Sequence, residues 1–261
     1  MHNRINDCFA RLRSQKRKGF IPYICAGDPN LEKTAELGLA LEKSGADLLE
    51  LGLPFSDPVA DGIVNQLAAQ RALTAGTTIR GVFDCVRDIR RKSQVPIVLY
   101  SYLNPIFQFG ADKFHSEAES SGVDGLLILD LPPEEDVDLS SGNVVHIRLI
   151  APTTPADRMK KIAKNAKGFL YYVSREGVTG ARDSVSTSLP EKIAELRKVS
   201  DLPIAVGFGI SNPEQARDVA QHADAVVVGS AIVDLIAKHG DKPEMVEKVG
   251  VFARDLAKAI H

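Results

Sequence analysis

Short apolar runs rich in β-branched residues recur along the 261-residue chain. Each run is apolar almost throughout and does not alternate between apolar and polar positions. Such runs are typical of parallel strands that other elements cover on both faces. Eight of them are present, within the segments that begin at residues 21, 47, 96, 125, 144, 168, 203 and 224.

Amphipathic segments separate these runs, so the pattern predicts strands and helices in alternation. Asn30 and Asn212 stand where helix N-caps belong, and Gly45 and Gly168 where helices end. This order fits a closed (β/α)8 barrel or an open doubly wound sheet. The first run leads into CAGDPN and not into the GxGxxG of a dinucleotide-binding sheet. We therefore predict a (β/α)8 TIM barrel and, since no Ser/Pro-rich linker interrupts it, a single domain over 1–261.

Two further helices are predicted to frame the barrel. Near the N-terminus a helical stripe of apolar residues indicates a cap helix with a solvated basic face, in preference to a transit peptide or a nucleic-acid-binding arm. GSAIVDLIAKHG (229–240) predicts a short extra helix after the eighth strand. The apolar stripe of the cap helix consists of Ile5, Cys8, Phe9 and Leu12.

Composition argues against several classes of function. Lys and Arg number 32 against 34 Asp and Glu, so no long-range field would gather a nucleic acid or an anionic membrane. No apolar run is long enough for a membrane span or a signal peptide. The three cysteines lie far apart and the histidines lack ligand spacing. We expect reduced thiols, no metal site and a cytoplasmic protein.

Acidic residues at predicted strand ends are the candidates for catalysis, because a βα barrel builds its active site at the carboxyl ends of its strands. Glu50 lies near the end of the second strand, Asp61 in the loop after it, and Asp130 near the end of the fourth. Glu50 is either catalytic or a structural carboxylate bonded to backbone or to a tyrosine. Asp130 precedes Leu-Pro and is interpreted first as a turn brace.

Glycine turns follow the seventh and eighth strands, where phosphate sites of these barrels are built. Gly207, Gly209 and Gly229 would let backbone N–H groups approach phosphate oxygens. Ser230 could add a hydroxyl, and the helix from Ala231 its positive end. Glycine also serves as a helix stop or a close-packing point, which is the alternative interpretation.

A long polar segment and a group of aromatic residues complete the predicted site. SREGVTGARDSVSTSLP (174–190) is too long for an ordinary connection and is interpreted as a lid, with an inert loop as the alternative. Aromatic residues at the strand ends predict a ligand with a flat apolar part beside its phosphate. They are Tyr23, Tyr100, Tyr102, Tyr171, Tyr172 and Phe208.

Six motifs together resemble the tryptophan synthase α subunit family, in order across nearly the whole chain. They are LLELGLPFSDPVADG (48–62), GDP (27–29), YLNP (102–105), SREGVTGAR (174–182), GFGIS (207–211) and GSAIV (229–233). The resemblance implies a (β/α)8 barrel that reversibly cleaves indole-3-glycerol phosphate to indole and glyceraldehyde 3-phosphate. It also implies an α2β2 heterotetramer, with pyridoxal phosphate in the β subunit and no cofactor in this chain.

The resemblance also assigns site residues, and this chain departs from the family pattern at one position. The family has Pro after ADG, where Ile63 stands here, so the stiffness of the loop is in question. The implied residues are Glu50 and Asp61 for catalysis, Thr179 and Gly180 in the lid, Gly209, Gly229 and Ser230 at the phosphate, Tyr23, Tyr171 and Phe208 at the indole, and Asp57, Pro58 and Asn104 at the β subunit.

The implied reaction makes sense of two carboxylates. A group that protonates indole C3 and later takes a proton from the glycerol hydroxyl needs a pKa raised towards neutrality, which the apolar strand end at Glu50 can provide. A separate ionised carboxylate would stabilise the positive charge on the ring N–H. We expect Asp61 to be that group, with its pKa kept low by a polar loop.

Two other interpretations remain. Another phosphate-handling barrel, such as an isomerase or synthase, would share the glycine turns but normally needs a Lys or a second strand-end acid in its pocket. None of the eight strand runs carries a Lys. A non-catalytic activator of a β subunit would tolerate the loss of Glu50, Asp61 or GFGIS, and all three are intact.

Overall fold

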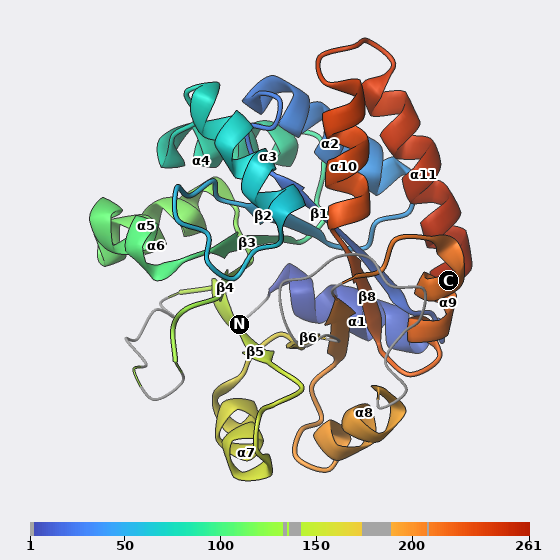
Figure 1. The fold of residues 1–261 in the computed structure, drawn as a ribbon. Helices are drawn as coiled ribbons and strands as arrows, with labels where there is room; N and C mark the ends of the chain where they lie inside the picture. Colours follow the sequence, from blue (N-terminus) through green and yellow to red (C-terminus); the bar gives the residue numbers. More distant parts are fainter. Residues whose placement is uncertain (1–2, 133–134, 136–141, 174–188, 208) are drawn as a thin grey trace.

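Eight parallel strands close into a barrel in chain order, and β8 pairs with β1 to complete it (Figure 1). The computed structural model describes residues 3–132, 135, 142–173, 189–207 and 209–261. Each predicted apolar run overlaps a strand, although β1 begins two residues before the first run, so the predicted barrel is confirmed. The strands are β1 (Gly19–Cys25), β2 (Leu49–Gly52), β3 (Ile97–Ser101), β4 (Gly125–Ile128), β5 (Val145–Ile150), β6 (Leu170–Val173), β7 (Ile204–Gly207) and β8 (Ala225–Val228).

Helices surround the barrel, and two of them begin as the sequence predicts. The side chains of Asn30 and Asn212 accept the backbone N–H groups of Lys33 and Gln215, over 2.8 and 2.9 Å. No helix in the described part of the chain is long and apolar enough to cross a membrane. The helices are α1 (Arg4–Ser14), α2 (Leu31–Lys43), α3 (Ile63–Thr74), α4 (Ile79–Arg90), α5 (Leu103–Phe109), α6 (Ala111–Ser121), α7 (Ala156–Asn165), α8 (Leu189–Arg197), α9 (Pro213–Ala220), α10 (Ser230–His239) and α11 (Met245–Ile260).

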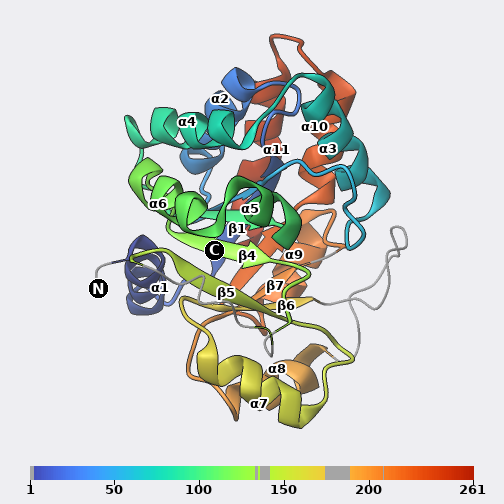
Figure 2. The same ribbon diagram turned by 90° about the vertical axis from the view of Figure 1, so that its left-hand side faces the viewer.

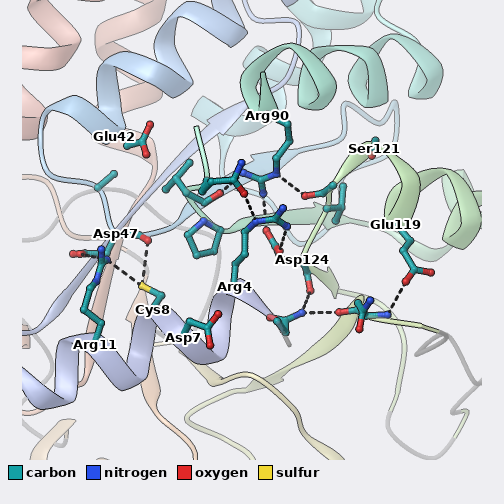
Figure 3. Close-up of a pocket in the computed structure, with 18 of the residues that line it drawn as sticks. Arg4, Asp7, Cys8, Arg11, Glu42, Asp47, Arg90, Glu119, Ser121 and Asp124 are labelled. Atoms are coloured by element: carbon teal, nitrogen blue, oxygen red, sulfur yellow. Dashed lines mark hydrogen bonds and ion pairs between the residues drawn. The ribbon is translucent and has the colours of Figure 1, made fainter. Parts of the chain in front are cut away.

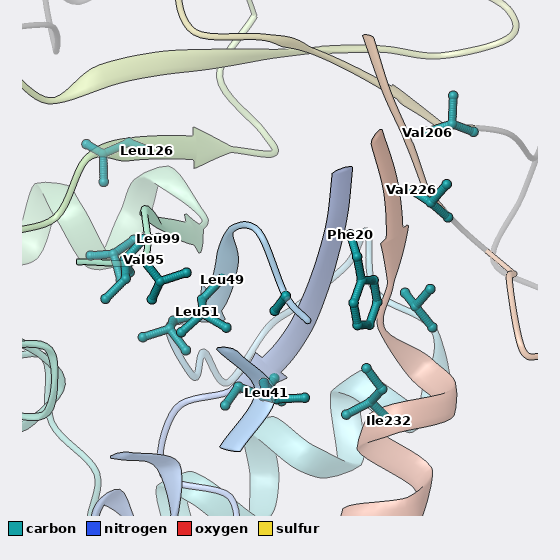
Figure 4. Packing of buried hydrophobic residues seen from close by; sticks show 14 of the residues in the cluster. Phe20, Leu41, Leu49, Leu51, Val95, Leu99, Leu126, Val206, Val226 and Ile232 are labelled. Carbon is teal, nitrogen blue, oxygen red and sulfur yellow. The ribbon is translucent and has the colours of Figure 1, made fainter. Parts of the chain in front are cut away.

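Apolar side chains form two layers, because successive residues of a strand point to opposite faces. On β1, Phe20 and Ile24 pack outward against the helices, whereas Ile21 and Tyr23 fill the interior of the barrel. Figure 4 shows the outer layer, in which Phe20 lies near Ile232 of α10. Polar groups that a strand directs inward are therefore enclosed by apolar neighbours.

The predicted cap helix is confirmed as α1. Its buried residues are the four of the predicted apolar stripe, and three of these four side chains are 5% exposed or less. The Asn3 amide before it donates to the backbone oxygens of Asp124 and Asn143, over 3.0 and 2.6 Å. These contacts place α1 across the end of the barrel where the strands begin. Figure 2 shows α1 on the left, whereas α3, which begins two residues after the predicted catalytic residue Asp61, lies on the right.

An aspartate with the same hydrogen-bond pattern stands before each of three strands. Asp47, Asp124 and Asp224 each precede a strand and accept an N–H of the neighbouring strand. For Asp124 the donor is Ile97 N–H, over 2.8 Å, and the Asp124 N–H bonds back to the Ile97 oxygen over 2.9 Å. These aspartates occupy equivalent places in three similar segments, SGADLLEL, SGVDGLLIL and HADAVVVGS. The repeated pattern therefore fixes strand register at this end of the barrel.

Arginines neutralise these aspartates. Arg90 and Arg4 pair with Asp124 over 2.6 and 2.9 Å, and Arg11 pairs with Asp47 over 3.2 Å. Figure 3 shows these pairs along a groove of about 1200 Å3 beside α1. The groove lies where the strands begin, at the opposite end from the predicted catalytic residues. We interpret this groove as a structural contact between α1 and the barrel and not as a ligand site.

Replacing Asp124 by Asn should destabilise the barrel strongly. The substitution leaves the largely enclosed Arg90 guanidinium without the counter-charge of the buried Asp124, and breaking a buried ion pair typically costs about 3 kcal/mol or more. In urea denaturation we expect Asp124→Asn to lower the unfolding midpoint well below that of the unmodified chain. The matched control is Asp88→Asn, which removes an exposed pair with Arg91 worth about 0.5 kcal/mol. Equal midpoints for the two variants would contradict the role of Asp124.

Candidate active site

Glu50 lies near the carboxyl end of β2 and is only 3% exposed. Leu48 belongs to the interior layer, so strand alternation directs Glu50, two residues on, into the barrel as well. Among the described residues, none donates a hydrogen bond to its carboxylate, which argues against the interpretation as a structural brace. Burial, and next the negative charge of Asp61, raise the pKa of Glu50 to about 8. This agrees with the expected pKa near neutrality.

Asp61 lies in the segment between β2 and α3 and is 5% exposed. Tyr100 and Tyr102 donate their hydroxyls to its two carboxylate oxygens, over 2.7 and 2.8 Å. Asn65 on the first turn of α3 adds a longer bond of 3.4 Å. The expectation that a polar loop keeps the pKa of Asp61 low is wrong. Burial raises this pKa, and the hydrogen bonds from the two phenols and Asn65 oppose the rise.

The two carboxylates differ in their surroundings and therefore in their charge. Three donors stabilise the anionic form of Asp61, and the charge of Asp61 in turn favours the neutral form of Glu50. The three donors favour ionisation of Asp61 before Glu50, and Glu50, with a pKa of about 8, is mostly protonated at neutral pH. The site therefore presents a carboxylic acid and a carboxylate together, which is the pairing that general acid catalysis at neutral pH requires.

Tyrosines form the apolar wall around the two carboxylates. Tyr23 and Tyr171 belong to the interior layer, and the Tyr23 ring meets the Tyr100 ring edge-on at 5.1 Å. Gly52 and Gly207 make room for the wall, because a Cβ at either would lie 2.3 Å from the hydroxyl oxygen of Tyr23 or Tyr171. One member of the predicted aromatic group, Tyr172, is not part of this wall.

Tyr172 faces the helices in the outer layer, because it follows Tyr171 directly on β6 and consecutive strand residues point to opposite faces. Its inclusion in the aromatic group was wrong.

The glycine turns lie at the ends of neighbouring strands, as predicted. β7 pairs with β8, and Gly209 and Gly229 follow them within two residues. Gly209 has a φ of +76°, which L side chains rarely adopt. Gly229 caps α10, which begins at Ser230, one residue before the predicted Ala231. The positive end of α10 and its unbonded first N–H groups suit an anion.

Three predicted site residues lie outside the described part of the chain, and one candidate carboxylate is structural. Thr179, Gly180 and Phe208 are the three, together with most of the predicted lid. The carboxylate of Asp130 accepts the N–H of Leu103 over 2.7 Å. Asp130 therefore has a structural role, but it braces the start of α5 and not the turn of its own Asp-Leu-Pro segment, which the sequence predicted.

The hydrogen bonds of Tyr100 and Tyr102 to Asp61 were not predicted. The sequence predicts for both tyrosines only a place beside the flat apolar part of the ligand. A signal was available in YSY (100–102), whose two tyrosines are spaced to share one face of an extended segment next to the strand that carries Glu50.

Comparison with known proteins agrees with this geometry. The family model of the tryptophan synthase alpha chain matches residues 9–261. A tryptophan synthase alpha chain from Opitutus terrae is 51% identical over 259 residues, which cover 97% of either chain. One from Geobacter sulfurreducens is 47% identical over 262 residues, covering 99% of either chain.

Solved structures agree as well. Tryptophan synthase subunit alpha from Legionella pneumophila superposes with a TM-score of 0.89 at 40% identity, covering 100% of this chain and 99% of that one. A chain of the tryptophan synthase α2β2 complex from Pyrococcus furiosus superposes with a TM-score of 0.85 at 37% identity, covering 93% and 99%. The chain therefore belongs to the tryptophan synthase alpha chain family and has the role of an α subunit in tryptophan biosynthesis.

Proposed function

We propose that this chain is a single-domain lyase that reversibly cleaves indole-3-glycerol phosphate to indole and glyceraldehyde 3-phosphate by a retro-aldol reaction. The observation that carries the proposal is the pair of buried carboxylates in one barrel mouth, Glu50 with a pKa of about 8 and Asp61 held by two phenols. The family relationship supports the choice of substrate.

In the first step Glu50 donates its proton to C3 of the indole ring. The ring becomes a cationic indolenine, and its N–H carries part of the positive charge. Asp61, the carboxylate that ionises first, faces this charge and lowers the energy of the cation. The protonated state of Glu50 at neutral pH is what makes it the donor.

In the second step the Glu50 carboxylate takes the proton of the glycerol hydroxyl next to the ring. The carbon–carbon bond between ring and side chain breaks, and its electron pair restores the aromatic indole while the alcohol carbon becomes an aldehyde. Glu50 is protonated again at the end of the cycle. A pKa of about 8 suits a group that must both give and take a proton.

The remaining groups bind the two ends of the substrate. Gly209 and Gly229, with Ser230, offer N–H groups and a hydroxyl to the phosphate where α10 begins. Tyr23 and Tyr171 flank the indole. For Thr179, Gly180 and Phe208 the assignment to lid and indole pocket rests on the resemblance alone.

The chain acts with a tryptophan synthase β subunit in an α2β2 heterotetramer, with pyridoxal phosphate in the β subunit. The related Pyrococcus furiosus chain comes from an α2β2 complex. Asp57 and Asn104 are exposed and Pro58 is half-buried, so all three are accessible to a partner. Exposed apolar side chains lie within a few residues of them along the chain: Val59 at 77%, Ile63 at 64% and Phe107 at 71%.

The loop after β2 and α5 form one continuous face. The hydroxyl of Tyr102, the residue before α5, accepts the N–H of Ala60 over 3.0 Å. The ring of Phe55 lies 5.3 Å from the Tyr102 ring. Ile63, in the position where the family has Pro, adds an exposed apolar side chain to this face.

Glu50→Gln should abolish catalysis while leaving the fold intact. Glutamine has nearly the shape of protonated glutamate but cannot transfer the proton, so we expect indole release to fall by at least about 100-fold. The assay is indole release from indole-3-glycerol phosphate, with and without β subunit. Glu36→Gln on the exposed face of α2 is the matched control and should keep full activity. Near-normal turnover by Glu50→Gln would refute the role of Glu50.

Phe107→Ser and Ile63→Ser should each weaken the binding of the β subunit. Apolar side chains buried at an interface often contribute more than about 1 kcal/mol, so we expect the Kd to rise roughly tenfold. Isothermal titration calorimetry with tryptophan synthase β subunit measures this Kd. Val251→Ser on α11, also exposed and apolar at 48%, is the control on a distant helix. An equal effect of Val251→Ser, or an unchanged Kd for Phe107→Ser, would contradict the proposed face.

A further inference from the structure

Asp61 accepts one phenolic hydrogen bond on each oxygen of its carboxylate. The bonds come from Tyr100 and Tyr102, which are 5% and 2% exposed. Burial, and next the charge of Asp61, raise the pKa of both hydroxyls far above neutrality. Each phenol therefore keeps its proton, and towards the carboxylate it can only donate.

The two tyrosines differ in what else they hold. Tyr102 also accepts the N–H of Ala60 and lies against Phe55, so it anchors the backbone of the loop. The hydroxyl of Tyr100 bonds only Asp61 among the described residues, and its ring rests edge-on against Tyr23. Tyr100 belongs to β3 in the wall of the barrel. Its hold on Asp61 therefore comes from the rigid wall and can be removed without freeing the loop.

Few other groups near Asp61 favour its anionic form. Asn65 donates from α3 over the long distance of 3.4 Å. No Lys or Arg in the described part of the chain lies within ion-pair distance of Asp61. Six titratable groups of the described residues sense its charge: Tyr23 and Cys25 on β1, Glu50 on β2, Tyr100 and Tyr102 at the end of β3, and Tyr171 on β6.

We propose that Tyr100 is a positioning residue for the lyase reaction: from the wall of the barrel its hydroxyl holds the Asp61 carboxylate anionic and in one orientation. The proposal rests on the proposed function, because the group that Asp61 serves is the ring N–H that becomes cationic. An anion fixed in advance stabilises that charge without having to reorganise during the reaction. A neutral or freely rotating Asp61 would lose this effect.

Tyr100→Phe removes the donor and keeps the ring that packs on Tyr23. Losing a hydrogen bond to the charged form makes that form less favourable, so the pKa of Asp61 must rise. We expect a rise of about one unit, on the order of a tenfold increase in proton affinity.

The direct test is the ¹³C NMR titration of aspartate carboxyl carbons in the full-length chain without ligand. The Asp61 signal is assigned by its loss in Asp61→Asn. It should titrate about one pH unit higher in Tyr100→Phe than in the unmodified chain. The matched control is Tyr172→Phe, which removes a hydroxyl from a tyrosine that faces the helices and should leave the Asp61 signal unchanged. An unchanged Asp61 titration in Tyr100→Phe overturns the proposal.

Indole release by the same proteins separates positioning from a merely structural role. In Tyr100→Phe the acid limb of the kcat profile should move to higher pH in step with the Asp61 titration. In the Asp61→Asn background Tyr100→Phe should cost nothing further, because the group that it serves is already gone. An equal loss in both backgrounds overturns the proposal. If the unmodified chain with β subunit releases no indole, the proposed function fails, and the NMR result still decides whether Tyr100 holds Asp61 anionic.

Discussion

Two carboxylates buried at the same end of one barrel cannot both ionise without a large cost in free energy. The chemistry of the site follows from which of the two carries the negative charge. Asp61 receives three donors and takes the charge. Glu50 receives none from the described residues and has a pKa of about 8. Two similar side chains thereby become an acid and an anion, each suited to a different step.

The two ends of the barrel treat buried carboxylates in opposite ways. Where the strands begin, Asp124 accepts a strand N–H and pairs with Arg90 over 2.6 Å, so its charge is fully compensated and serves stability. Where the strands end, Asp61 is held by neutral phenols and Glu50 has no cation beside it among the described residues. Without a fixed counter-charge beside it, Glu50 can gain and lose a proton near neutral pH, while the phenols hold Asp61 as the anion. The division agrees with the general placement of stability and catalysis in such barrels.

The strands could be predicted because their residues are buried on both faces and are therefore apolar throughout. The alternation of strands and helices implied a helix after β2, but the bounds of α3 could not be predicted, because its buried residues are Ala68, Ala69 and Ala72 and leave little apolar periodicity. Glu50 and Asp61 could be named from strand ends and family motifs. The pKa of Asp61 could not be predicted, because the loop that carries Asp61 is polar in sequence. The burial of Asp61 depends on contacts with Tyr100 and Tyr102, which lie about forty residues away along the chain. No local sequence pattern shows such a contact.

The central claim is that Glu50 is a neutral acid beside an anionic Asp61 at neutral pH, and a ¹³C NMR titration of glutamate carboxyl carbons in the full-length chain measures it directly. The Glu50 signal is the one that disappears in Glu50→Gln. Our account predicts that this signal titrates near pH 8, well above the value of about 4.3 that is usual for a glutamate side chain in water. A Glu50 signal that titrates near the usual glutamate value of about 4.3 would contradict the account.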